Sequence, residues 1–120
     1  IDLTTGGGSV DVSSAGLFTV VAGTVSSAGA GATLSTNIGT ATFTGFTTAA
    51  AGTQTFTITN TLVAATSSIF VTVTNVGSND AQMTLQRVKP AAGSFEVMTK
   101  NNGAAALNGD VLINFWVFDV

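Results

Sequence analysis

The chain has 120 residues, of which 45% are hydrophobic and only 8% are charged, and its formal net charge is −3. It contains no His, Cys or Tyr, which removes the usual general base, the Cys and His nucleophiles, disulfides and Cys-based metal sites. We therefore expect no enzyme and no cofactor, and because Lys and Arg together number only 3, no nucleic-acid partner.

The N-terminal third of the chain is rich in Gly, Ser and Ala. Residues 26–31 offer little that could pack, whereas the apolar pieces at residues 10–12 and 17–21 could form brief strands. We predict an N-terminal arm over residues 1–39, either ordered along a neighbour or mobile, followed by a β-sandwich domain over residues 40–120. No segment approaches the roughly 18 consecutive apolar residues of a membrane span, so we expect no membrane partner.

From residue 39 onward, segments of β-branched and aromatic residues alternate with Gly and Asn turns. Around Phe56 and Ile58 the apolar residues, Leu62 included, are predicted to face inward while Thr side chains face outward. In the predicted strand at residues 68–75, Phe70 departs from this pattern, because it is an aromatic residue among the side chains predicted to face outward. Helical spacing of apolar residues is nearly absent. The pattern predicts an all-β fold, an antiparallel β-sandwich or jelly roll, with six strands at residues 40–47, 54–62, 68–75, 81–89, 94–100 and 110–120.

The last predicted strand is unusual because both of its alternating residue sets are apolar. Successive side chains of a strand point to opposite faces, so both faces should be covered. One set is predicted to build the core and consists of Val111, Ile113, Phe115 and Val117. The other set, which ends at Val120, is predicted to contact another subunit, and the interface candidates are Phe70, Leu112, Trp116 and Phe118.

One hairpin can be predicted in register. Residues 90–93 have Pro at the first position and Gly at the last, which favours a four-residue turn. This turn places Arg87 opposite Glu96 and the preceding Leu85 opposite Met98. The Arg87–Glu96 ion pair is expected to fix the register and to add little stability.

Binding sites for small ligands are weakly indicated. The polar residues at 79–80, 101–102 and 108–110 could offer oxygen ligands to Ca²⁺, but tight turns explain them better. Phe70, Trp116 and Phe118 could form a platform for a sugar ring, although packing is the simpler interpretation. We predict no catalytic residue and no metal site.

Three segments together resemble a known class of β-rich domain: residues 68–75 (SIFVTVTN), 87–97 (RVKPAAGSFEV) and 113–117 (INFWV). They are similar to modules of tailed-bacteriophage structural proteins, namely tail-fibre and capsid-decoration modules, over roughly residues 52–120. The resemblance implies a β-sandwich on the virion surface, typically assembled as a trimer, without catalytic residues. The short chain lacks a long fibrous repeat, which favours a capsid decoration or cement protein.

The functional expectation is therefore a structural protein that stabilises a phage shell as an oligomer. Its expected partners are further copies of itself, as a homotrimer, and a major capsid protein. One alternative is a receptor-binding module of a tail fibre, which would recognise a host surface glycan or protein through residues 76–80 and 101–109. Another is a subunit of an extracellular filament whose N-terminal segment donates a strand to its neighbour.

Overall fold

The computed structural model describes residues 22–77 and 81–118. This part of the chain contains strands and no helix, and therefore no helix that could cross a membrane. The strands in chain order are β1 (Gly23–Ser27), β2 (Gly31–Thr33), β3 (Ile38–Thr48), β4 (Thr53–Thr59), β5 (Ser68–Asn75), β6 (Met83–Ala91), β7 (Ser94–Asn101) and β8 (Leu107–Phe118).

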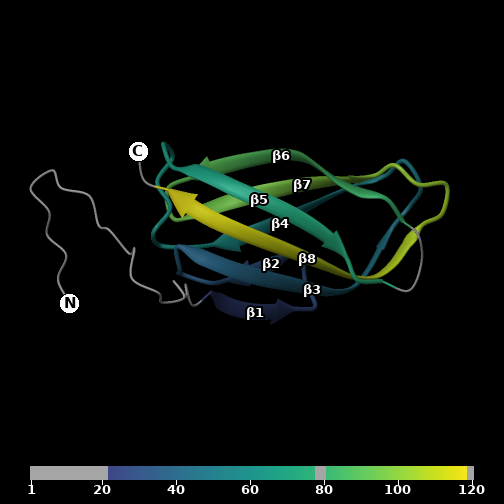
Figure 1. Cartoon of the computed structure of the whole chain (residues 1–120), viewed down its shortest axis with the longest axis horizontal. Coiled ribbons are helices and arrows are strands. Elements are labelled where there is room, and N and C mark those ends of the chain that lie inside the picture. Colours follow the sequence, from purple (N-terminus) through teal and green to yellow (C-terminus); the bar gives the residue numbers. More distant parts are fainter. Residues whose placement is uncertain (1–21, 78–80, 119–120) are drawn as a thin grey trace, which may run out of the picture.

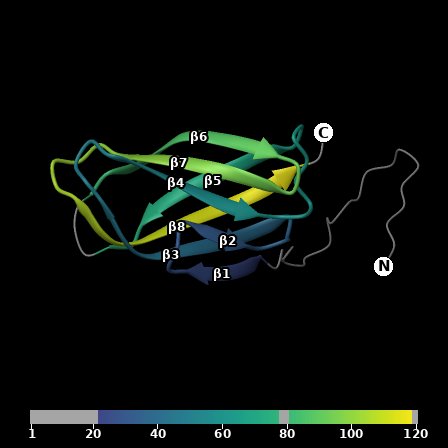
Figure 2. The same cartoon turned by 180° about the vertical axis from the view of Figure 1, so that it is seen from behind.

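The strands form two sheets of four strands each, packed face to face (Figures 1 and 2). The first, which we name sheet I, has the order β1-β3-β8-β5, and the second, sheet II, has the order β2-β4-β7-β6. The chain changes sheet at every connection except the one between β6 and β7. The all-β sandwich that the strand pattern predicts is thus confirmed.

The core lies between the sheets because the central strands β4, β7 and β8 alternate buried residues, most of them apolar, with more exposed outward ones. Phe43 of β3 stacks on Phe56 of β4 with ring centroids 4.4 Å apart, and Phe95 meets Phe115 edge to face at 5.2 Å. The predicted division of β8 is confirmed, since its inward residues are buried while Trp116 and Phe118 are exposed. The fully buried apolar side chains are Ala41, Phe43, Phe56, Ile58, Phe95, Val97, Leu107, Val111 and Ile113.

Two strands lie where the sequence predicts none. β1 and β2 fall within the Gly-, Ser- and Ala-rich stretch, and they pair in parallel with β3 and β4, so the sandwich is not purely antiparallel. As edge strands they need little apolar area: Val25 of β1 and Ala32 of β2 pack partly against the core. Residues 26–31 themselves are mostly exposed, and within this range Ala30 alone packs partly against the core, in agreement with the expectation that this stretch has little to pack. The brief strands predicted at residues 10–12 and 17–21 lie outside the described residues.

Strand β5 has the predicted bounds, whereas β4 ends earlier than predicted. Asn60 is buried directly after β4, and its side-chain Oδ1 accepts the backbone N–H of Leu62 at 2.9 Å, which turns the chain away from the sheet. Leu62 is consequently 45% exposed, and its predicted inward position is wrong.

The register of the β6–β7 hairpin also differs from the prediction. β6 continues through Pro90, so that Ala91 pairs with Ser94 and Glu96 lies opposite Lys89, not Arg87. The turn is shorter than predicted and places Gly93 at φ 80°, a left-handed conformation that Gly adopts without strain. Pro90 is tolerated within the strand because β6 is an edge strand of sheet II, where a missing N–H need not interrupt the ladder.

Candidate interaction surface

The outward side of sheet I carries three neighbouring aromatic side chains, which we name the aromatic cluster: Phe70, Trp116 and Phe118. Trp116 and Phe118 point outward from β8 because they alternate with the buried Phe115 and Val117. Phe70 points outward from the neighbouring strand β5, directly opposite Trp116 in the register.

The rings of the cluster contact one another but remain open to solvent. Trp116 stacks on Phe118 with centroids 4.7 Å apart and an interplanar angle of 27°, and Phe70 meets Phe118 edge to face at 5.3 Å. Phe70 is 67% exposed, Trp116 46% and Phe118 38%. Adjacent exposed aromatic rings of this kind are typical of surfaces that bind another molecule.

The strand register arranges the outward side of sheet I in rows that run across the strands. Trp116 lies between Ile38 of β3 and Phe70 of β5, which makes an apolar row. The next row is polar and places Asn114 between Thr40 and Thr72; the Thr40 hydroxyl donates to Asn114 Oδ1 at 2.8 Å. The row beyond it is mixed and consists of Thr42, Leu112 and Thr74.

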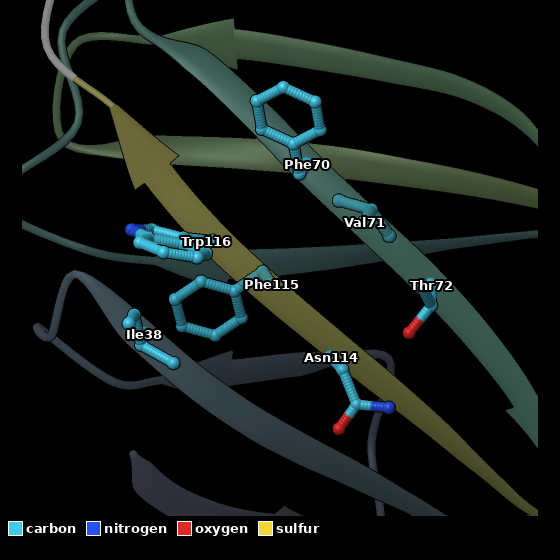
Figure 3. Close-up of a pocket in the computed structure, with 7 residues that line it drawn as sticks. All are labelled: Ile38, Phe70, Val71, Thr72, Asn114, Phe115 and Trp116. Atoms are coloured by element: carbon cyan, nitrogen blue, oxygen red, sulfur yellow. The ribbon is translucent and has the colours of Figure 1, made fainter. Parts of the chain in front are cut away.

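A hollow of about 330 Å³ opens between the first two rows. Figure 3 shows its lining side chains, which come from β3, β5 and β8 and include the rings of Phe70 and Trp116. Asn114 and Thr72 supply polar atoms to it. Within the described residues, the Asn114 amide nitrogen and the Thr72 hydroxyl have no hydrogen-bond partner. The full lining is Ile38, Phe70, Val71, Thr72, Asn114, Phe115 and Trp116.

Charge is distributed unevenly between the two sheets. All three cations of the chain, Arg87, Lys89 and Lys100, lie with Glu96 on the outward side of β6 and β7 in sheet II. On sheet I, Asp110 is the one charged side chain among the described residues. It lies at the β3 bulge, away from the aromatic cluster, where its carboxylate accepts the Gly45 N–H at 3.0 Å. Within residues 22–77 and 81–118, no charged side chain therefore lies beside the aromatic cluster.

The predicted interface residues do not all lie together. Phe70, Trp116 and Phe118 form one cluster, while Leu112 shares their face but is separated from Trp116 by Asn114. The hollow is also lined by Ile38, Thr72 and Asn114, none of which is among the predicted interface residues. A signal for Asn114 is present in the sequence, since it is a polar residue between Leu112 and Trp116 in the largely apolar outward set of the closing strand.

The predicted contact between Arg87 and Glu96 exists despite the different register. Their side chains lie on the same face, with Nη2 and Oε2 3.3 Å apart, because Arg87 reaches Glu96 diagonally across the ladder. Both side chains are about half exposed, so the pair contributes about 0–1 kcal/mol.

Two of the residues considered as Ca²⁺ ligands, Asn101 and Asn108, make hydrogen bonds within the fold. Asn101 is fully buried, and its amide nitrogen donates to the carbonyl oxygens of Ala105 at 2.8 Å and Thr48 at 3.2 Å. Asn108 accepts a hydrogen bond from Thr47 at 3.1 Å. In residues 22–77 and 81–118, no three acidic side chains gather as ligands of a metal ion. The candidates Asn79 and Asp80 lie outside the described residues.

Comparison of the chain with models of protein families, with curated proteins and with solved structures finds no match.

Proposed function

We propose that this protein is a structural component of a bacteriophage virion, a capsid decoration or cement protein that stabilises the shell through protein contacts. The observation that carries the proposal is the aromatic cluster on an uncharged sheet face, together with the resemblance in residues 68–75, 87–97 and 113–117. Burial of such a face stabilises an assembly by roughly 25 cal/mol for each Å² of apolar surface removed from water, less the cost of association.

The resemblance implies a position on the virion surface, with further copies of the chain and a major capsid protein as partners. A homotrimer is the assembly that this class of protein favours. The outward sides of the two sheets differ in chemistry, which suits a molecule with two kinds of contact: sheet I carries the aromatic cluster toward the end where β8 finishes, whereas sheet II carries the Lys and Arg side chains.

Immunogold labelling of particles of the virus that encodes the chain tests this proposal. Label over the shell exterior is the expected result, and purified protein should bind to particles from which the decoration layer has been stripped. Absence of the protein from purified particles contradicts the proposal.

A second candidate function, a receptor-binding module of a tail fibre, is favoured by the hollow. Aromatic rings beside free polar atoms, here those of Asn114 and Thr72, are suited to the apolar face and hydroxyl groups of a sugar. Label confined to tail fibres, together with binding of the isolated protein to host cells, would support this function instead.

A further inference from the structure

We infer that the outward side of sheet I is where one copy of this chain packs against another, with the aromatic cluster and the hollow within the contact. This inference deepens the proposed function, on which it rests, by assigning a partner to one surface. It leaves the cationic side of sheet II for other contacts.

The charge distribution of the two sheets favours self-association through sheet I. Two identical faces carry identical charges, so a face that meets its own copy must avoid like charges at its centre. The rows through Trp116, Asn114 and Leu112 carry no charged side chain, and Asp110 lies at the far end of β8 beside the β3 bulge. By contrast, the outward side of sheet II carries three cations and one carboxylate, Glu96, so two copies that met through this side would bring two net positive surfaces together.

The polar side chains on the outward face of sheet I can form hydrogen bonds with their own copies. The polar residues of the face are Thr and Asn, whose side chains each contain a donor and an acceptor. A Thr hydroxyl can therefore pair with the same hydroxyl of another copy, which a carboxylate or an ammonium group cannot do. Thr72 and the amide nitrogen of Asn114 have no partner within the described residues, so they are available for such pairing.

The outward face of sheet I also has a shape that can interlock with a copy of itself. Phe70 is the most exposed large apolar side chain of the described residues, and it stands beside the hollow bounded by Trp116 and Asn114 (Figure 3). A face with both a projection and an adjacent recess can interlock with its copy, because the ring of Phe70 can enter the recess of the neighbour. This holds for a pair about a two-fold axis and for three faces turned inward about a three-fold axis.

The outward face of sheet I is nearly large enough for a stable interface. Strands about 4.8 Å apart with a rise of about 3.3 Å per residue give this sheet face a footprint on the order of 700 Å². A standard interface buries about 800 Å² on each partner, with an apolar centre and a polar rim. The face thus has nearly the area of a stable contact, and Asp110 falls at its rim.

The chain provides its own reporter for the experiment. Trp116 is its single Trp, and Tyr is absent, so the intrinsic tryptophan emission comes from this face alone. We expect the emission of the full chain to shift to the blue between low and high micromolar concentration, and analytical ultracentrifugation to show a dimer or a trimer over the same range.

Two matched pairs of variants locate the contact. Thr72→Glu places a carboxylate at the hollow, and Thr59→Glu places one at an exposed outward position of sheet II. Trp116→Ala and Leu62→Ala both remove an apolar side chain that is about half exposed. We expect Thr72→Glu and Trp116→Ala to raise the dissociation constant at least about 100-fold, and the two controls to change it less than about threefold.

Several results overturn the inference. They are a monomer at high micromolar concentration, disruption by Thr59→Glu equal to that by Thr72→Glu, and a shift of Trp116 emission by neutral oligosaccharides, such as maltohexaose or chitohexaose, in a protein that does not associate. Particle labelling is unaffected by these results, so failure of the inference is distinguishable from failure of the proposed function.

Discussion

The buried side chain of Asn60 donates a hydrogen bond from Nδ2 to the carbonyl oxygen of Thr36, 2.8 Å away. This bond joins the segment after β4 to the segment before β3. Because Asn60→Ala leaves this carbonyl and the N–H of Leu62 without their partner, we expect the free energy of unfolding to fall by about 2 kcal/mol. Urea denaturation followed by circular dichroism measures it. The exposed Asn102, which donates to the Thr84 hydroxyl at 2.6 Å, is the control, and Asn102→Ala should cost less than about 1 kcal/mol. Equal losses would contradict the role of burial.

Phe43 and Phe56 stack in the core, so removal of one of these rings should lower the free energy of unfolding more than the loss of the Asn60 hydrogen bonds does. Phe56→Ala removes a fully buried ring and is expected to cost about 3–5 kcal/mol. Phe70→Ala removes an equal number of atoms from a ring that is 67% exposed, and it should cost less than about 1 kcal/mol in the monomer. Thermal unfolding at low protein concentration distinguishes the two, and a comparable loss from Phe70→Ala would show that this ring is more tightly packed than its exposure indicates.

The close approach of Gly109 to Gly77 predicts a steric effect. A Cβ atom at Gly109, where φ is +144°, would lie 2.6 Å from the Cα of Gly77, whereas one at Gly93, with φ +80°, would meet nothing within 4 Å. We therefore expect Gly93→Ala to cost roughly 1–2 kcal/mol for the backbone conformation alone, and Gly109→Ala at least about 1 kcal/mol more. Denaturant titration of both variants provides the measurement. Similar losses would mean that the backbone at Gly77 yields easily.

Loss of the Arg87–Glu96 ion pair should change the free energy of unfolding only slightly. Because both side chains are about half exposed, Glu96→Gln should change the free energy of unfolding by less than about 1 kcal/mol, and added salt should reduce the difference between the variant and the parent protein. Denaturation at low and high salt measures both quantities. A loss of several kcal/mol would contradict the expectation that this half-exposed pair adds little stability.

The sequence predicted best those elements in which one residue set is strongly apolar. β5 has the predicted bounds because Ile69, Val71 and Val73 alternate with polar residues, Phe70 excepted, and the two sides of β8 separate as predicted. β1 and β2 were missed because each is a short edge strand with few apolar side chains. Their backbone hydrogen bonds with β3 and β4 leave no periodic signal in the sequence.

The hairpin and the hollow show a second limit of sequence reasoning. Pro90 was assigned to a turn from its general preference, but the edge position of β6 allows it within a strand. The aromatic cluster could be predicted in part, since Phe70 is an outward aromatic residue in β5 and Trp116 is one in β8. That Ile38 of β3 completes their row depends on the pairing of β3 and β5 with β8, which a single sequence does not contain.

The alternation of the chain between the two sheets has a consequence for how the protein folds. Among the strands of residues 22–77 and 81–118, only β6 and β7 are neighbours in both sequence and sheet, so every other pairing there must close a longer loop before it is stabilised. Because nearly every described strand is flanked in the chain by strands of the opposite sheet, we expect the two sheets to form together. We expect folding in milliseconds to seconds, as in other sandwiches with non-local pairing, and a single cooperative transition for both sheets.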